Sequence, residues 1–171
     1  NAVYDSDKNI QKIWKILEDK KLLDDTIVVF TSDHGEEFND NGLNYWGHNG
    51  NFTDAQIKIP LVVHWPGRAS KVFDHLTTAY DVSATMMTDA LGCENNQGDF
   101  SVGKSLFEVT EEEWFLCGSY QNTAVVEKNR IVIMNAAGVL EFRQKNYKRT
   151  TDTTRTANLW QAIEMMGKYR R

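Results

Sequence analysis

The chain has 171 residues, of which 41% are hydrophobic and 25% are charged. This composition is ordinary for a globular domain and excludes disordered, collagen-like and disulfide-scaffold proteins. The longest apolar runs hold four residues, whereas a membrane-spanning helix needs about 20. The net charge of −5 argues against a nucleic-acid-binding protein, because phosphate neutralisation needs a cationic surface. The chain opens on Asn1 rather than Met, and we expect it to be a piece of a longer protein.

Basic residues gather at the C-terminal end. Residues 143–171 contain eight basic and two acidic residues, a net charge of +6, while residues 1–142 carry −11. Such a cluster is either a solvated helix face or a surface that contacts anionic lipid headgroups. The candidate lipid contacts precede the last predicted helix, and they are Lys145, Lys148, Arg149 and Arg155.

The first predicted element is an amphipathic helix over residues 7–23, with Ser6 or Asp7 as its N-cap. Its apolar side chains recur at helical spacing, at Ile10, Ile13, Trp14 and Leu17. The β-branched run 26–32 has no polar alternation, which is typical of a strand covered on both faces. A helix that leads into such a strand indicates an α/β fold.

Residues 33–54 lack periodicity and are rich in asparagine and glycine. A loop of this length inside a domain is usually functional or disordered. Because it also contains four aromatic residues, we interpret it as ordered and site-forming. An apolar strand over 57–65 and a helix over 80–91 then repeat the α/β pattern.

The last third of the chain has a different pattern. Four short apolar segments, 114–120, 123–127, 130–134 and 139–143, are separated by turn residues and predict an antiparallel meander. A threonine-rich stretch then leads to a closing helix, which places Leu159, Trp160, Ile163 and Met166 on one face.

The strongest candidate for chemistry is Asp33-His34-Gly35, directly after the first strand, where α/β folds bind ligands. A carboxylate oxygen and an imidazole nitrogen are ligands for Zn²⁺ or Mn²⁺, and Gly35 permits the sharp turn that brings both to one cation. His48 lies between glycines in the asparagine-rich loop, where the backbone can approach a ligand closely. We expect the side chains of Asp33 and His48 within about 10 Å of each other, since two-metal sites place their ions roughly 4 Å apart.

The remaining acids and histidines have less specific signals. Glu36 and Glu37 have two possible roles. They either adjust the properties of a metal or of its bound water without binding the metal directly, or they stabilise the N-terminus of a helix through its dipole. We interpret His64 and His75 as structural histidines.

Five short motifs stand in the order found in sulfatases, namely Thr31-Ser32-Asp33-His34-Gly35-Glu36-Glu37, Gly47-His48, Ile59-Pro60-Leu61-Val62, Trp65-Pro66-Gly67, and Asp81 with Thr85. They resemble the second half of a sulfatase-type domain of the alkaline phosphatase superfamily. More narrowly, residues 38–52 and 100–107 resemble the periplasmic domain of a Gram-negative inner-membrane protein. The resemblance implies that residues 1–107 are the C-terminal half of the α/β core. Residues 108–171 would add the meander and closing helix to the same domain.

By this resemblance, Asp33 and His34 match ligands of the metal that also holds the family's nucleophile, and His48 matches the other metal or the substrate side. The implied cofactor is a divalent cation, Zn²⁺, Mn²⁺ or Mg²⁺. Neither Cys93 nor Cys117 stands in the sulfatase Cys-x-Pro/Ala-x-Arg motif, so we expect this chain to lack the nucleophile. The two cysteines form either a disulfide or two separate buried thiols.

The resemblance leaves two functions open. The parent protein is either a metal-dependent hydrolase or transferase of phosphate or sulfate esters, or a regulatory module that senses lipopolysaccharide or an anionic lipid such as cardiolipin. Relatives often carry a histidine where this chain has Ala79, two residues before Asp81. The expected location is the periplasmic face of the inner membrane. The expected partners are the N-terminal half of the domain and a membrane-spanning segment.

Overall fold

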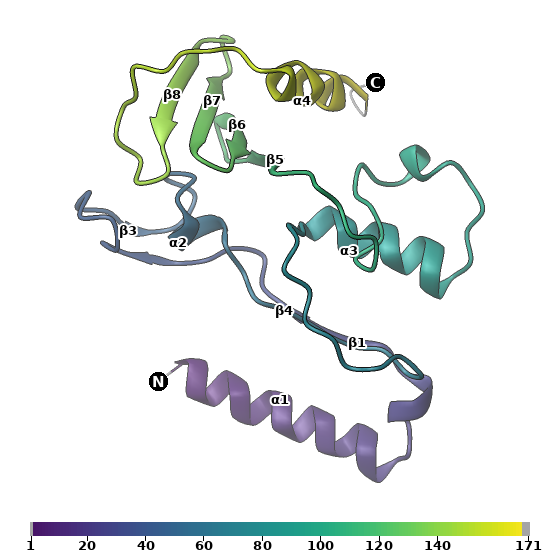
Figure 1. Ribbon diagram of the computed structural model, residues 1–171. Helices are drawn as coiled ribbons and strands as arrows, with labels where there is room; N and C mark the ends of the chain where they lie inside the picture. The colour runs from purple at the N-terminus through teal and green to yellow at the C-terminus, as the bar shows by residue number, and fades with distance from the viewer. Residues whose placement is uncertain (1, 169–171) are drawn as a thin grey trace. The chain divides into compact units, whose positions relative to one another are not determined.

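The computed structural model describes residues 2–168, and its helices and strands belong to two units (Figure 1). One unit consists of the residues up to Ser32 together with Ile59–Val72. The other consists of Asp33–Lys58 together with the chain from Phe73 onward. The loop that follows Ser32 belongs to the second unit, because its Phe52 packs with the C-terminal meander.

The first unit packs one helix against a two-stranded ladder. It contains α1 (Ala2–Asp19), the 3-10 turn η1 (Leu23–Asp25), β1 (Val28–Thr31) and β4 (Leu61–His64). The strands pair antiparallel, with Val28 opposite His64 and Thr31 opposite Leu61. The Trp14 ring of α1 lies 5.2 Å from the His64 ring, edge to face. His64 Nε2 lies 2.9 Å from the Leu23 carbonyl oxygen, which fits the predicted structural role.

Helix α1 begins at Ala2, so Ser6 and Asp7 lie inside it and the predicted N-cap is wrong. No glycine or proline interrupts residues 2–6, and the helix continues through them. Of the predicted apolar face, Trp14 and Leu17 are half-buried, while Ile10 and Ile13 are exposed. The ladder is only two strands wide, and within the described residues it covers one part of the helix.

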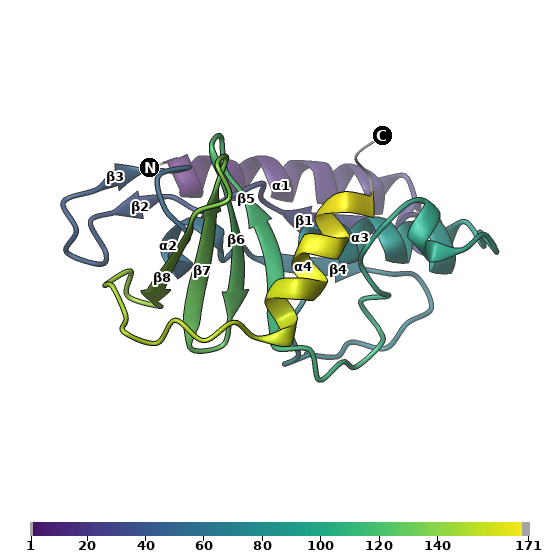
Figure 2. The same ribbon diagram turned by 90° about the horizontal axis from the view of Figure 1, so that it is seen from above.

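The second unit is built on a four-stranded antiparallel meander in the order β5-β6-β7-β8. Its strands are β5 (Trp114–Gly118), β6 (Asn122–Glu127), β7 (Arg130–Asn135) and β8 (Leu140–Gln144), and they confirm the predicted meander. Figure 2 shows the closing helix α4 (Ala157–Lys168) alongside β5. The predicted fold class is thereby confirmed, although the second predicted strand is shorter than 57–65 because its first residue belongs to α2 (Asp54–Ile57).

The meander is buried on both faces, because successive side chains of a strand point to opposite sides. On one face, Leu159 and Ala162 of α4 pack against Trp114, Val125 and Val132. On the other face, Phe52 packs against the buried side chains Ala124, Val126, Ile131 and Ile133. Phe52 lies in the asparagine-rich loop, so the meander is the platform that holds this loop in place.

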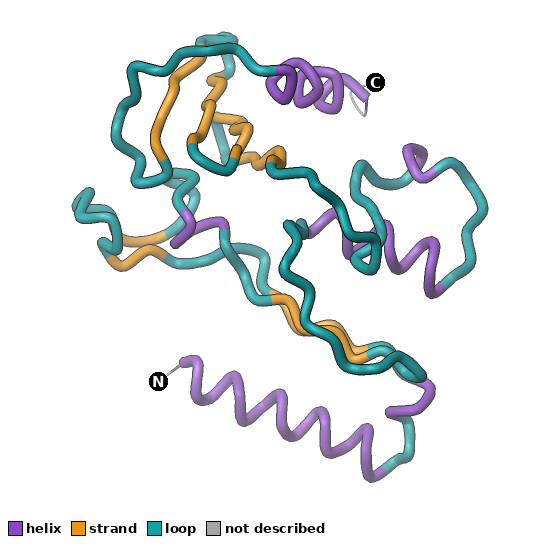
Figure 3. Tube along the Cα trace, in the orientation of Figure 1, coloured by secondary structure: helices purple, strands orange, loops and turns teal. Residues whose placement is uncertain are grey.

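The asparagine-rich loop predicted over 33–54 and the residues up to 58 include only short regular elements (Figure 3). These are β2 (Glu37–Phe38), β3 (Trp46–Gly47) and α2, and Figure 1 shows α2 between this hairpin and the meander. Beyond the loop, α3 (Ala79–Thr85) continues into a π-helical turn η2 (Met86–Ala90), and a separate 3-10 turn η3 (Gln97–Asp99) follows after six residues. Together α3 and η2 fill most of the helix predicted over 80–91.

Candidate metal centre

Gly35 sets the position of the segment Asp33–Glu36, which carries candidate metal ligands. Its N–H donates to the Gln56 carbonyl oxygen of α2 at 2.8 Å. A Cβ atom at this position would lie 2.2 Å from the Ala55 carbonyl oxygen, a distance that only glycine tolerates. The segment Asp33–Glu36 therefore runs directly against the backbone of α2, and His34 and Glu36 flank the point of contact.

The hairpin β2–β3 brings the segment that contains His48 to the segment Asp33–Glu36. Glu37 pairs with Gly47 and Phe38 with Trp46, so the residues just outside the hairpin, Glu36 and His48, meet. Gly47 has φ +124°, a backbone conformation that favours glycine. The Tyr45 hydroxyl donates to the His48 carbonyl oxygen at 2.9 Å and fixes the loop beyond the hairpin.

His34, Glu36 and His48 form the cluster at this meeting point. Their possible ligand atoms lie within 4.8 Å of one another. The two imidazole rings are stacked, with centroids 4.1 Å apart and planes inclined by 25°. His48 Nδ1 lies 2.8 Å from Glu36 Oε2, and His34 Nδ1 lies 2.9 Å from the Gly35 carbonyl oxygen. All three side chains are partly open to solvent, so a cation and a substrate have access to them.

Asp33 lies at the edge of this cluster. Its Oδ2 is 3.6 Å from His34 Nε2, and its Oδ1 accepts a hydrogen bond from the His34 backbone N–H at 3.0 Å. The cluster thus contains two of the three predicted ligands, His34 and His48, together with Glu36, while Asp33 contacts His34.

Glu37 lies in different surroundings from its neighbour Glu36. Successive residues of β2 point to opposite sides, and Glu37 is fully buried while Glu36 is exposed. Burial alone raises the pKa of the Glu37 carboxyl, but hydrogen bonds from Asn51, Asn41 and Gln56 outweigh burial and lower the pKa below its usual value. Glu37 is therefore a structural carboxylate of the loop, and it does not contact the candidate ligands directly.

The donors fit a divalent cation in kind. Two imidazole nitrogens and one or two carboxylate oxygens suit Zn²⁺ or Mn²⁺. Ligand atoms of a tetrahedral Zn²⁺ with bonds of about 2.0 Å lie about 3.3 Å apart, which is somewhat closer than the limit of 4.8 Å found here. The cluster therefore has the required chemistry in a slightly open arrangement.

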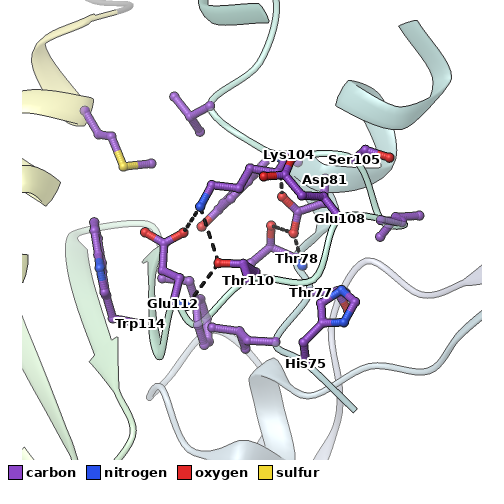
Figure 4. A pocket seen from close by; sticks show the side chains of 16 residues that line it. His75, Thr77, Thr78, Asp81, Lys104, Ser105, Glu108, Thr110, Glu112 and Trp114 are labelled. Carbon is purple, nitrogen blue, oxygen red and sulfur yellow. Dashed lines mark hydrogen bonds and ion pairs between the residues drawn. The ribbon is translucent and has the colours of Figure 1, made fainter. Parts of the chain in front are cut away.

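A separate cavity of about 100 Å³ lies near the start of α3 (Figure 4). Its polar groups pair among themselves: Lys104 Nζ contacts Glu112 at 3.1 Å and Thr110 at 3.4 Å. Burial raises the pKa of Tyr80, which lines the cavity, to about 12. None of the predicted metal ligands lines this cavity.

Asp81, beside the cavity, is used to hold the backbone. It accepts hydrogen bonds from the backbone N–H and the hydroxyl of Thr78, and from the backbone N–H of Lys104 (Figure 4). His75 also lines the cavity and contacts the Phe73 ring edge to face, which fits its predicted structural role.

The predicted lipid contacts differ in their surroundings. Lys145 pairs with Asp54 at 3.0 Å, and Arg149 lies 3.6 Å from Glu141. Lys148 and Arg155 are exposed. Of the basic residues at the end of the closing helix, Lys168 is described, and Arg170 and Arg171 lie outside the described residues.

The order of helices and strands, with the loop that carries the candidate ligands after β1, is that of an α/β fold. The sulfatase family model matches residues 1–92, more than half of the chain, and the chain belongs to the sulfatase family. Sequence reasoning therefore identified the family from the motifs that begin at Thr31.

Two proteins of known sequence are similar to most of the chain. The chain is 23% identical over 139 residues to the inner membrane protein YejM of Salmonella typhimurium, which covers 81% of the chain and 23% of the relative. It is 27% identical over 126 residues to an uncharacterized protein of Haemophilus influenzae, covering 72% of the chain and 21% of the relative. The chain thus spans less than a quarter of the length of these relatives.

A solved structure shares the fold. The phosphonate monoester hydrolase of Agrobacterium radiobacter superposes with a TM-score of 0.67 at 20% identity, over 95% of this chain and 38% of that one. Within residues 2–168, no helix is long and apolar enough to cross a membrane.

Proposed function

We propose that the loop 33–50 supplies part of a metal-dependent site for phosphate or sulfate esters. The observation that carries this proposal is the convergence of His34, Glu36 and His48, whose ligand atoms lie within 4.8 Å of one another. The names of the relatives support it, because they include a choline-sulfatase of Rhizobium meliloti and the phosphonate monoester hydrolase already described. Both names refer to the cleavage of an ester of an oxidised sulfur or phosphorus acid.

The residues of this chain would divide the task as follows. His34 and His48 would donate imidazole nitrogens to the cation, and Asp33 would add a carboxylate oxygen. Glu36, 2.8 Å from His48 Nδ1, holds that imidazole in one orientation, as a carboxylate commonly does behind a metal-bound histidine. A bound divalent cation would supply Lewis-acid stabilisation of negative charge on an ester oxygen.

The remaining parts of the site would come from a longer protein. Burial raises the pKa of the Cys117 thiol, which disfavours the thiolate that a nucleophile needs. We therefore propose that the nucleophile and further ligands lie in the N-terminal half of the domain. Since the relatives include inner membrane proteins, we also propose that the parent protein is anchored there and that this domain faces the periplasm.

Removal of one imidazole tests the metal site. Isothermal titration of the wild-type chain with Zn²⁺ or Mn²⁺ should show one bound ion. His48→Ala should weaken the affinity by at least about tenfold, because loss of a ligand costs no less than loss of a residue that orients one.

His75→Ala is the matched control, since it removes a partly buried imidazole of the same unit outside the cluster. It should bind the ion as tightly as the wild type. A wild-type chain that binds no ion, or a His48→Ala variant that binds it as tightly, would contradict the proposal.

A second candidate is a regulatory module that binds anionic lipid such as lipopolysaccharide or cardiolipin. The observation that favours it is the exposure of Lys148 and Arg155 in the segment between the meander and α4, in a chain similar to inner membrane proteins. Lys145 and Arg149 contribute less, because each lies near a carboxylate.

Co-sedimentation with cardiolipin-containing vesicles tests this second candidate. Each exposed basic residue near the membrane adds about 1 kcal/mol. Changing Lys145, Lys148, Arg149 and Arg155 to Gln should therefore weaken binding by at least roughly 30-fold, the effect of the about 2 kcal/mol that Lys148 and Arg155 alone contribute. The attraction should also fall with salt, because the Debye length is about 8 Å at physiological ionic strength. The control variant carries the same four changes at Lys12, Lys15, Lys20 and Lys21 around α1. Equal binding by both variants would exclude a lipid site in the segment 145–155.

A further inference from the structure

Glu37 is a carboxylate with 0% of its surface exposed. It accepts hydrogen bonds from Asn51 Nδ2 at 2.6 Å, from Gln56 Nε2 at 2.6 Å and from Asn41 Nδ2 at 3.1 Å. Burial of a charged group is costly unless hydrogen bonds compensate it. Three amide groups from the same loop provide this compensation, and those of Asn51 and Gln56 tie β2 to the segment that follows β3.

Gln56, which is 3% exposed, is the central partner in this network. Its side-chain Oε1 accepts from the backbone N–H of Gly50 at 3.0 Å and of Asn51 at 3.2 Å. Its backbone carbonyl accepts from the N–H of Gly35 at 2.8 Å. Gln56 therefore contacts the backbone of both segments that carry candidate ligands, beside His34 in one and near His48 in the other.

We infer that Glu37 and Gln56 act together as a pair of positioning residues that hold His34, Glu36 and His48 in register. The inference rests on the proposed function, because it concerns the same cluster. Glu37 is adjacent to Glu36 in the chain, and Gln56 accepts hydrogen bonds from Gly35, next to His34, and from Gly50, two residues after His48. Neither residue touches the candidate cation site, so both act through the backbone they fix.

The pair specifies geometry in a way that an apolar pair of equal volume does not. Hydrogen bonds fix distance and angle, and a buried polar network with all its partners favours one arrangement. The stacked imidazoles, with centroids 4.1 Å apart, come from the two segments that the β2–β3 pairing brings together. Beyond the two paired residues of each strand, Gln56 binds the backbone of both segments, and Glu37 holds its side chain.

Glu37→Gln tests the inference with almost no change in volume. The new amide presents a donor where Asn51 or Gln56 also presents one, so the network loses a partner. We expect the nuclear Overhauser effect between the ring protons of His34 and His48 to weaken in the metal-free chain. We also expect Zn²⁺ affinity to fall at least tenfold, as for other residues that orient metal ligands.

The exchange Glu37→Gln with Gln56→Glu provides a rescue. It restores one carboxylate facing one amide between the two positions, and the carboxylate at position 56 can still accept from Gly50 and Asn51. We expect this double variant to regain part of the ring contact and to bind Zn²⁺ at least threefold more tightly than Glu37→Gln.

Glu127→Gln is the control for stability, because it removes a mostly buried, hydrogen-bonded carboxylate of the same unit at another place. Below its unfolding temperature it should keep the ring contact and the Zn²⁺ affinity of the wild type.

The two readouts separate this inference from the proposed function. A wild-type chain that binds no Zn²⁺, while the ring contact still depends on Glu37, would refute the proposed function and leave the positioning pair standing. A Glu37→Gln variant with unchanged ring contact would overturn the inference. So would a double variant no better than Glu37→Gln, or an equal loss of contact in Glu127→Gln.

Discussion

Replacing Glu127 by alanine should lower the free energy of unfolding by about 3 kcal/mol, because it breaks a mostly buried ion pair and leaves Arg130 without its nearest partner. Glu127 Oε2 accepts from Arg130 Nε at 2.5 Å. Its Oε1 accepts from Thr156 and Asn158, at the start of α4. One carboxylate thus joins the β6–β7 turn to the closing helix, and urea unfolding at pH 7 measures its contribution.

The contribution of Glu127 to the free energy of unfolding should depend on pH. Burial tends to raise the pKa of Glu127, but hydrogen bonds from Arg130, Thr156 and Asn158 and the Arg130 charge lower it below its usual value. A carboxyl whose folded-state pKa is lowered stabilises the fold above its unfolded pKa, and this stabilisation disappears as pH falls through the folded value. The difference between the wild type and Glu127→Gln should therefore be large at pH 7 and shrink toward pH 3. Glu164→Gln, on the exposed side of α4, should change stability by less than about 0.5 kcal/mol at either pH.

Gly35→Ala should abolish most of the metal affinity, with at least a tenfold loss. The added Cβ would lie 2.2 Å from the Ala55 carbonyl oxygen, and this neighbour is backbone that cannot rotate away. The segment that carries His34 and Glu36 would have to move away from α2, and it would lose its hydrogen bond to Gln56. Zn²⁺ titration measures the loss, and circular dichroism should show that the meander persists.

Gly118→Ala makes the same chemical change at a position with no atom within 4 Å of the new Cβ. Its metal affinity should equal that of the wild type. A Gly35→Ala variant that also binds like the wild type would show that close packing against α2 does not position the donors.

The fold could be predicted from the sequence where local pattern and tertiary packing agree. The meander could be predicted because β6 and β7 are short apolar strands bounded by turns. Their side chains are apolar on both sides because both faces of the sheet are buried. Helix α1 was predicted over 7–23, but it begins at Ala2 and ends at Asp19, and no residue between Ala2 and Ser6 opposes a helix. The strand predicted from Ile57 was too long, because α2 takes up Ile57 while Pro60 precedes β4.

The sequence indicated Asp33, His34 and His48 as candidate ligands, but it did not indicate the residues that hold their segments. The imidazoles and Asp33 stand in short motifs with glycine, which mark them in the chain. Glu36 and Glu37 were indistinguishable by sequence, because their different roles depend on the two-residue pairing of β2 with β3. Gln56 was missed entirely. Nothing in the pattern around a four-residue helix indicates that its side chain binds Gly50 and Asn51 across the loop.

The most direct test of the proposed metal centre is anomalous diffraction at the zinc edge from crystals of the chain grown with Zn²⁺. The predicted result is a peak at bonding distance, about 2.0–2.1 Å, from an imidazole nitrogen of each of His34 and His48. The carboxylate of Glu36 or Asp33 should lie beside that peak. A peak bound to other residues, such as His75, or stacked imidazoles with no ion between them at saturating Zn²⁺, would contradict the metal centre.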